Sequence, residues 1–489
     1  MERAPLKNIF ASYQAYDACF DEVFAEDGTV RPHYHKLYEL FSGYTLRDFQ
    51  ELNERTKLAF FNQGITFAVY SDEAGGSERI FPFDLFPRII PASEWSMIEK
   101  GIIQRNYALN LFLHDLYHDK KILKDKVVPA DLVFSSGNYN KYMIGHNPVG
   151  GIYNHISGTD LIRHRDGKYY ILEDNIRCPS GVSYILANRE AMKSGLSDLF
   201  QESQVALVKP YPVELLATIQ SVAPENVDQP TAVVLTPGIF NSAYYEHSFL
   251  AQRMGIELVE GRDLLVDNDF VYMKTIYGRQ KVDIIYRRVD DEFLDPMVYR
   301  PDSMLGVPGL MTAYRAGNVT LVNAPGTGVA DDKAVYTYVP QIIRYYLGEE
   351  AILHNVPTWH CEKPDDLKYV LGNMAELVLK PVDESGGYGI VIGPQATRAQ
   401  LDEYRTRILA NPRKYIAQPV MSLSTHATYI EDEVMFEPRH IDLRIFSLLG
   451  KDRHYVLKGG LSRVALRRGS LIVNSSQGGG SKDTWVLEK

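Results

Sequence analysis

One stretch of this sequence narrows the choice of fold more than any other: Leu172-Glu-Asp-Asn-Ile-Arg-Cys-Pro-Ser-Gly181. It lies at the end of a β-rich run and closes in a Pro-Ser-Gly turn. Alternate residues of a strand share a face, so Glu173 and Asn175 can converge on one ligand, together with Asp160 from a neighbouring strand. These oxygen donors suit Mg²⁺, which takes few protein carboxylates and completes its shell with phosphate and water oxygens. The alternative is a charged strand end capped by a turn.

A glycine-rich loop follows a lysine-bearing strand later in the chain, in Leu377-Val-Leu-Lys-Pro-Val-Asp-Glu-Ser-Gly-Gly-Tyr-Gly-Ile390. The strand presents Lys380, and Gly386, Gly387 and Gly389 let backbone N–H groups approach an anion closely. The lysine adds a point charge at the same end. No Gly-Lys-Ser/Thr closes the loop, so it is not a Walker loop. The pattern predicts either a phosphate-binding loop or a plain hairpin turn.

Further cationic side chains lie near strand ends and glycine turns. Arg177 comes two residues after Asn175 and would face the same phosphate. Arg287 closes a predicted strand of an α/β unit, where ligands tend to gather. The other candidates are Lys333, Arg444, Arg463 and Lys482. For each arginine the alternative is a surface ion pair, and around Lys482 it is an irregular terminus.

Strands alternate with helices from Thr231 onward, which predicts an α/β fold with a parallel sheet. Its expected elements are strands at 232–236, 256–259 and 283–287 and a helix at 244–254. Later strand-like runs lie at 377–380, 415–418, 443–447 and 471–473. The first 130 residues show helical spacing of apolar side chains over 34–61, broken near Gly43, and over 93–117. His114 and His118 have the spacing of a metal-ligand pair, but Asp115 follows the first, so we interpret them as solvated or core-edge histidines.

The composition is that of an ordinary globular protein. The 489 residues include 52 basic and 62 acidic side chains, a formal net charge of −10, which disfavours nucleic-acid binding. No run approaches a membrane span, and three distant cysteines offer neither a disulfide framework nor a metal clip. The N-terminus has no apolar run typical of a signal peptide. These features predict a cytoplasmic protein without a membrane or nucleic-acid partner.

Taken together, these segments resemble the ATP-grasp superfamily in a rotated order. The usual order is a lysine in an Asp-Lys context, a strand lysine with a glycine-rich lid, a hinge strand along the adenine, and a Glu-x-Asn metal motif. Asp332-Lys333, Lys380 with its loop, and Tyr415-Ile-Ala-Gln418 follow that order, but Glu173-Asp-Asn175 comes first. This permutation is similar to the circularly permuted ATP-grasp family, often described as glutathionylspermidine-synthase-like.

The resemblance implies a role for each matched residue. Lys333 and Lys380 would contact nucleotide phosphates, beneath a lid formed by residues 386–389. Ala417 and Gln418 would lie along the adenine, with Gln418 hydrogen-bonding its polar edge where many hinges carry glutamate. The metal ligands would be Asp160, Glu173 and Asn175. The cations for the transferring phosphoryl group would be Arg177, Arg444 and Arg463, and the candidates on the substrate side are Ser180, Arg287 and Lys482.

The resemblance also implies an architecture and an activity. We expect a helical N-terminal region at 1–130, a metal-binding half at 131–228, a Rossmann-like domain at 229–355 and a lid and nucleotide half at 356–489. The implied protein is an ATP- and Mg²⁺-dependent ligase that joins a small-molecule or peptide carboxylate to an amine through an acylphosphate. The alternative is a nucleotide-binding regulatory or scaffold protein without turnover.

Overall fold

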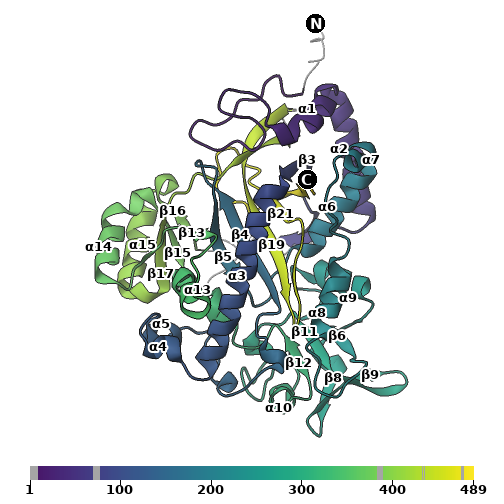
Figure 1. Cartoon of the computed structure of the whole chain (residues 1–489), viewed down its shortest axis with the longest axis vertical. Helices are drawn as coiled ribbons and strands as arrows, with labels where there is room; N and C mark the ends of the chain where they lie inside the picture. The colour runs from purple at the N-terminus through teal and green to yellow at the C-terminus, as the bar shows by residue number, and fades with distance from the viewer. Residues whose placement is uncertain are drawn as a thin grey trace.

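The computed structural model describes residues 9–69, 77–382, 389–431, 433, 435–474 and 478–488. Within them, the largest sheet has nine strands, with the core order β13-β5-β4-β19-β21-β22-β3 and with β18 and β20 paired to β19. Its strands are β3 (Phe83–Ile90), β4 (Ile156–Arg163), β5 (Tyr169–Asn175), β13 (His354–Asn355), β18 (Thr425–Ile430), β19 (Met435–Leu449), β20 (His454–Val456), β21 (Leu461–Val464) and β22 (Gly480–Val486). Figure 1 shows the long helix α3 (Ala92–Tyr117) crossing this sheet.

The central pairing of this sheet joins early and late parts of the chain. Strands β4 and β19 run antiparallel, with Asp160 opposite Arg444. All residues of β4 are buried, because both of its faces are covered. The expected mixed α/β architecture is therefore confirmed, and the first specific motif of the sequence lies directly beside the last third of the chain (Figure 1).

A parallel sheet with the order β12-β11-β6-β7 forms a second layer. Its strands are β6 (Ala232–Leu235), β7 (Glu257–Val259), β11 (Ile284–Arg287) and β12 (Thr320–Val322). The predicted strands and the predicted helix, α9 (Tyr244–Met254), are confirmed. The strand order reverses between β6 and β11, so the crevice outside the carboxyl ends of these two strands is the expected place for a ligand.

A small antiparallel sheet, β14-β17-β15-β16, carries the predicted lysine strand. Its strands are β14 (Trp359–His360), β15 (Leu377–Pro381), β16 (Val391–Ile392) and β17 (Tyr415–Pro419), and α14 (Pro364–Asn373) and α15 (Arg398–Ala410) belong to the same unit (Figure 1). Its own core holds Leu379, Ala417 and Ile408. The predicted strand at 471–473 is wrong, since this segment is irregular.

The N-terminal region contains the predicted helices α1 (His35–Ser42), α2 (Leu46–Asn62) and α3. A capping box between Thr45 and Asp48 starts α2 and explains the break near Gly43. This region also contributes β3, which pairs in parallel with β22 and which the sequence analysis did not predict. Asp84 and Arg88 are buried polar residues within β3, so its hydrophobic alternation is hidden.

The remaining strands form a two-stranded sheet, β1-β2, and a three-stranded sheet, β10-β9-β8, and further helices accompany them. The strands are β1 (Thr66–Val69), β2 (Ser77–Ile80), β8 (Leu264–Asp267), β9 (Phe270–Thr275) and β10 (Gly278–Val282). The helices are α4 (Lys121–Lys124), α5 (Ala130–Phe134), α6 (Val182–Gly195), α7 (Ser197–Glu202), α8 (Tyr211–Gln220), α10 (Leu310–Arg315), α11 (Gly328–Asp331), α12 (Lys333–Tyr336) and α13 (Val339–Leu347). None of the helices in the described ranges has both the length and the apolar character that crossing a membrane requires.

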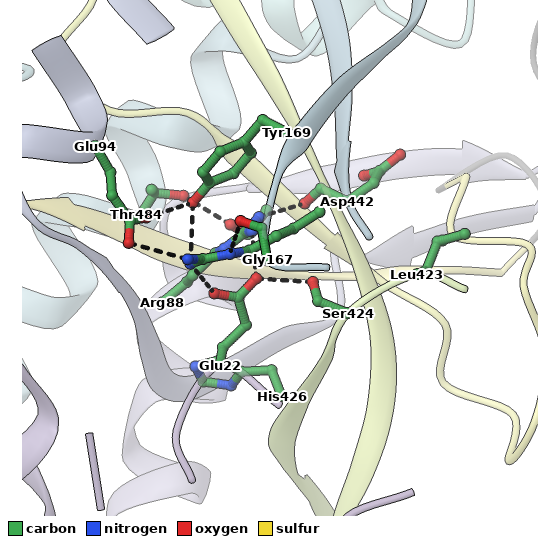
Figure 2. Close-up of polar contacts among 12 residues, drawn as sticks. Glu22, Arg88, Glu94, Gly167, Tyr169, Leu423, Ser424, His426, Asp442 and Thr484 are labelled. Carbon is green, nitrogen blue, oxygen red and sulfur yellow. Dashed lines mark hydrogen bonds and ion pairs between the residues drawn. The ribbon is translucent and has the colours of Figure 1, made fainter. Parts of the chain in front are cut away.

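A buried ionic network ties the N-terminal segment to the central sheet (Figure 2). The Glu22 carboxylate accepts hydrogen bonds from Arg88 of β3 (2.5 Å), Arg163 of β4 (3.1 Å) and Ser424 (2.7 Å). Burial opposes ionisation of Glu22, but the two guanidiniums outweigh it and keep the pKa of Glu22 below its usual value. Arg88 also donates to the backbone carbonyl of Asp442 on β19 (3.3 Å).

Replacing Glu22 with alanine is expected to lower the free energy of unfolding by about 3–5 kcal/mol, because two guanidiniums would remain buried without their carboxylate. Thermal melting followed by circular dichroism measures this loss. The matched control is Glu26→Ala, which removes an exposed glutamate from the same segment. Equal melting temperatures for the two variants would contradict the prediction.

Candidate active site

The central pocket lies between the nine-stranded sheet and the small sheet that carries Lys380, and spans about 930 Å³, part of it open to solvent. Six residues predicted from the sequence line it: Asp160, Glu173, Lys333, Lys380, Gln418 and Arg463. Ten apolar side chains also line it: Ile162, Leu172, Val378, Ile390, Ile392, Met421, Leu423, Leu471, Ile472 and Val473. The pocket therefore combines charged groups with an apolar lining.

A β-bulge aims Glu173 into the pocket. Asp160 pairs with Glu173 across β4 and β5, whereas the next residue of β4, Leu161, pairs with Ile171, so Leu172 is the extra residue. Both Leu172 and Glu173 then line the pocket. Asp174 is buried on another side, where its carboxylate accepts from Arg105 of α3 at 2.6–3.0 Å. This ion pair fixes the strand that carries Glu173.

Asn175 lies next to the pocket residues on the same strand, and its Nδ2 donates to the backbone carbonyl of Gly158 (3.1 Å). The Oδ1 atom is thus the one that remains for a cation. In the described residues, no group of three or more His, Cys, Asp and Glu side chains gathers as a metal site. The predicted set of two carboxylates and one amide is smaller, and it suits an ion that shares its shell with phosphate oxygens.

Asp160 connects the acidic strand to two arginines. Its carboxylate accepts from Arg444 at 2.6 and 2.8 Å and from Arg463 at 2.7 Å. Burial opposes its ionisation, but these guanidiniums hold the pKa of Asp160 well below its usual value. Arg463 also donates to Asp442 (2.9 Å), and Arg444 is 3.8 Å from Glu173. Two of the three arginines predicted for the phosphoryl group, Arg444 and Arg463, are therefore held beside the predicted metal ligand Asp160.

The two predicted phosphate-binding lysines come from different elements. Lys333 begins α12, where the Asp332 side chain accepts from the backbone N–H of Ala334 (2.8 Å), and its Nζ is 3.4 Å from the Glu173 carboxylate. Lys380 is 8% exposed on β15, and its Nζ donates to Gln418 Oε1 (2.6 Å). Burial lowers the pKa of Lys380 to about 8. Glu173, Lys333 and Lys380 thus meet in one pocket.

The hinge strand β17 is placed differently from the expectation. Gln418 lines the pocket, but its amide oxygen faces Lys380 and its Nε2 donates to Thr358 Oγ1 (2.9 Å). Ala417 is buried in the core of the small sheet, and the pocket wall passes through Pro419 instead. The Ala417 side chain therefore does not line the pocket, and a place for this residue along an adenine stays a prediction.

The lid prediction falls mostly outside the described residues, which exclude Gly386 and Gly387. Gly389 has a φ of +69°, and a Cβ there would come within 3.1 Å of Pro381. Its backbone carbonyl accepts from the Tyr404 hydroxyl of α15 (2.6 Å), which ties the segment before β16 to that helix.

Other predicted residues surround the turn after β5. Arg177 donates to Asp331 (2.7 Å). The Ser180 hydroxyl accepts from Arg288, and its carbonyl accepts from Arg444 (3.1 Å). Arg287 is completely buried and donates to the backbone carbonyls of Asn323 (2.7 Å), Val289 (2.9 Å) and Ala324 (3.2 Å). Arg287 therefore holds loops at the carboxyl end of the parallel sheet, with its donors already used by the protein.

The placement of Lys482 contradicts its predicted role. It lies on β22, fully buried, where its ammonium pairs with Asp84 and donates to the carbonyls of Ala427 (2.9 Å) and Phe86 (3.2 Å). It faces away from the central pocket because β22 packs against β3 and not against the small sheet. His118, which follows α3, is hydrogen-bonded through Nδ1 to the carbonyl of His114 (2.9 Å), and among the described residues these histidines belong to no group of three or more possible metal ligands.

Sequence reasoning missed several residues around the pocket. The Thr358 hydroxyl accepts from Gln418, and the Asp442 carboxylate accepts from Arg463. The turn that carries Ser180 is held by Arg288, which donates to the Pro179 carbonyl, and by Glu246, which accepts from the Gly181 N–H. Only Asp442 had a usable signal, since it lies two residues before Arg444 on one strand and shares its face. The other three act on groups that are distant in sequence.

Comparisons with known proteins agree with this geometry. A family model described as "Circularly permuted ATP-grasp type 2" matches residues 87–465. An uncharacterized protein of Synechocystis is 53% identical over 97% of this chain and 98% of its own length. A putative glutamate–cysteine ligase of Frankia alni is 42% identical over 96% of this chain, which spans only 54% of that relative.

A solved structure shows the same fold with little sequence likeness. It is a glutathione synthetase-like effector from Globodera pallida, with a TM-score of 0.56 and 12% identity, covering 89% of this chain and 96% of that one. The family match covers most of the chain, including β4, β5, β15, β17 and β19, the strands that build the pocket. This chain belongs to the circularly permuted ATP-grasp type 2 family.

Proposed function

We propose that this protein is an ATP- and Mg²⁺-dependent ligase that joins a carboxylate to an amine. One observation carries the proposal: Glu173 of the early strand and Lys333 and Lys380 of the late segments line a single pocket. Family membership and the name of the Frankia relative support a ligase. The meeting of these three residues matters because separate pockets for them would leave no place for one metal-bound triphosphate.

The donor set fits both groups that the proposal needs. Two lysines and two arginines face three carboxylates, Asp160, Glu173 and Asp442, around the charged end of the pocket. The two lysines would bind a triphosphate, and the Glu173 carboxylate and the Asn175 amide oxygen would bind Mg²⁺. The apolar lining suits the base, since a ring that packs against it is removed from water.

The proposed ligase reaction requires that the substrates be positioned and that negative charge be neutralised. A bound ATP supplies the phosphoryl group that turns an unreactive carboxylate into an acylphosphate, which an amine then attacks to form an amide. Arg444 and Arg463, already held at Asp160, would stabilise negative charge that develops during transfer. Lys333 and Lys380 would fix the phosphates in line with the acceptor. No protein nucleophile is required.

The proposal names the substrates only by chemical class. The activity in the name of the Frankia relative belongs to a protein of which this chain spans about half. We therefore infer from that name only that the substrates are an acid and an amine, without choosing a particular pair. The turn that carries Ser180 lies between the central pocket and the crevice of the parallel sheet, so we place the carboxylate there.

The test is ADP release by the purified full-length chain with MgATP, screened against pools of amino acids, peptides and polyamines. A ligase gives ADP only when an acid and an amine are both present, together with a condensed product by mass spectrometry. MgATP binding without ADP release in any pool favours the alternative, a nucleotide-binding regulatory protein. Absence of MgATP binding would overturn both.

Nucleotide affinity is expected to fall as the pH rises through about 8. Burial lowers the pKa of Lys380 to about 8, and Lys333 lowers it further while Glu173 and Asp160 oppose the change. Phosphates interact favourably with the charged form of Lys380, so the lysine is protonated in the nucleotide complex. The affinity therefore has its highest value below the pKa of the free protein, where Lys380 is already protonated before binding. Above it, calorimetry between pH 7 and 9.5 should show a loss approaching about tenfold per pH unit.

The matched variant for this pH series is Lys380→Arg, because a guanidinium keeps its charge throughout the range. Its affinity for MgATP should depend much less on pH. A wild-type affinity that stays constant from pH 7 to 9.5 would show that Lys380 does not titrate in this range in the nucleotide-free protein.

A further inference from the structure

The polar contacts of Gln418 use its amide oxygen and one of its two amide hydrogens. The residue is 2% exposed, with Oε1 at 2.6 Å from Lys380 Nζ and Nε2 at 2.9 Å from Thr358 Oγ1. An ammonium can only donate, so the amide atom that faces it must be the oxygen. The nitrogen then faces Thr358, whose own hydroxyl hydrogen goes to the carbonyl of Val356 (2.9 Å). In this orientation each of the two contacts of Gln418 joins a donor to an acceptor, whereas a flipped amide would place its NH₂ group against the ammonium.

The same chain of hydrogen bonds reaches the metal-binding strand. The backbone N–H of Val356 donates to the carbonyl of Ile171 on β5 (3.0 Å) and to the Tyr336 hydroxyl (2.9 Å). Ile171 immediately precedes the bulge that aims Glu173. Lys380, Gln418, Thr358 and the backbone of Val356 therefore form a relay from the small sheet to the strand of Glu173.

We propose that Gln418 is a positioning residue that sets the distance between the Lys380 ammonium and the metal-binding strand, and that it does not read the nucleobase. The inference rests on the proposed function, because it concerns how Lys380 meets a phosphate. A lysine side chain has four rotatable bonds and gains by being held in place before the ligand arrives. The amide of Gln418 provides that hold from the hinge strand.

The inference separates affinity from base selection. If Gln418 acts only through Lys380, its loss weakens every nucleotide that carries the same phosphates, whatever the base. If Gln418 binds the adenine edge, its loss weakens ATP and leaves GTP unchanged or improved. The ratio of the two affinities therefore distinguishes the two roles.

The experiment uses the full chain and the variants Gln418→Met, Thr358→Val and their combination, with Thr358→Ser as the conservative control. Calorimetry measures binding of MgATP and MgGTP. Gln418→Met removes both amide contacts and should weaken MgATP and MgGTP by the same factor, about tenfold or more. Thr358→Val should weaken both by a smaller common factor, whereas Thr358→Ser keeps the hydroxyl and the wild-type affinity.

The double variant tests the relay itself. Adding Thr358→Val to Gln418→Met should cause no further loss, because the link is already broken. In steady-state assays the KM for ATP should rise, with the KM for acid and amine unchanged. Additive losses, or a changed ATP-to-GTP ratio in Gln418→Met, would overturn the inference and leave the proposed function standing. If Gln418→Met does not fold, Thr358→Val and Thr358→Ser give the same comparison of ratios. Wild-type protein that binds neither nucleotide would overturn the proposed function first.

Discussion

Replacing Lys380 with alanine is expected to weaken nucleotide binding strongly while the protein stays folded. The ammonium is buried between β15 and β17, and a triphosphate in the pocket would be its counter-charge. Removing one partner of a buried, hydrogen-bonded charge pair costs about 2–5 kcal/mol, so the affinity for MgATP should fall by about thirtyfold to several thousandfold. Isothermal titration calorimetry with MgATP measures this loss.

The fold should tolerate the Lys380 change because the lysine makes no ion pair within 4 Å in the described residues and pays a desolvation cost that lowers its pKa. Removing it relieves that cost. The matched control is Lys458→Ala, which removes an exposed lysine outside the pocket. Unchanged affinity in Lys380→Ala would take the central lysine out of the proposed site.

Changing Glu173 to glutamine together with Asn175 to alanine is expected to remove Mg²⁺-dependent turnover, by about a hundredfold or more. Glu173 faces the pocket beside Lys333 and Arg444, and Asn175 follows on the same strand. Glutamine keeps the shape of the side chain but removes the charge that a hard cation needs. Initial rates of ADP release, titrated with Mg²⁺, report the loss.

The strand itself provides the control for the metal prediction. Asp166→Asn alters an exposed carboxylate in the turn between β4 and β5, far along the same hairpin from Glu173. It should keep wild-type turnover and wild-type Mg²⁺ dependence. Turnover at the wild-type level in the double variant would show that these two residues do not hold the metal.

The local patterns of the sequence predicted the elements well where they depend on neighbours in the chain. Helices α3 and α9 and strands β6, β11, β15 and β17 lie close to where apolar spacing and glycine turns place them. Strand β3 was missed because Asp84 and Arg88 occupy buried positions in it. These charges are tolerated only because Lys482 and Glu22, which are distant in sequence, neutralise them.

The sequence predicted which residues would gather in the candidate site, but it did not predict which of them contact each other. Glu173, Lys333 and Lys380 were correctly expected to face one pocket. The contacts of Gln418 were not foreseen, because the motif shows a polar residue on β17 and cannot show that Lys380 on β15 donates to its amide oxygen. Lys482 was misplaced for a related reason: a lysine beside glycines suggests an anion site, whereas its actual partner is Asp84 of β3.

The sequence alone determined the family and the residue types of the pocket, since the order of its motifs and the Glu-Asp-Asn string are covalent facts of the chain. Tertiary structure decided which charges pair. Asp160 and Arg444 are 284 positions apart, and only the antiparallel pairing of β4 with β19 brings them within hydrogen-bonding distance. The partner of a buried charge is set by sheet register and packing, and those depend on the whole chain at once.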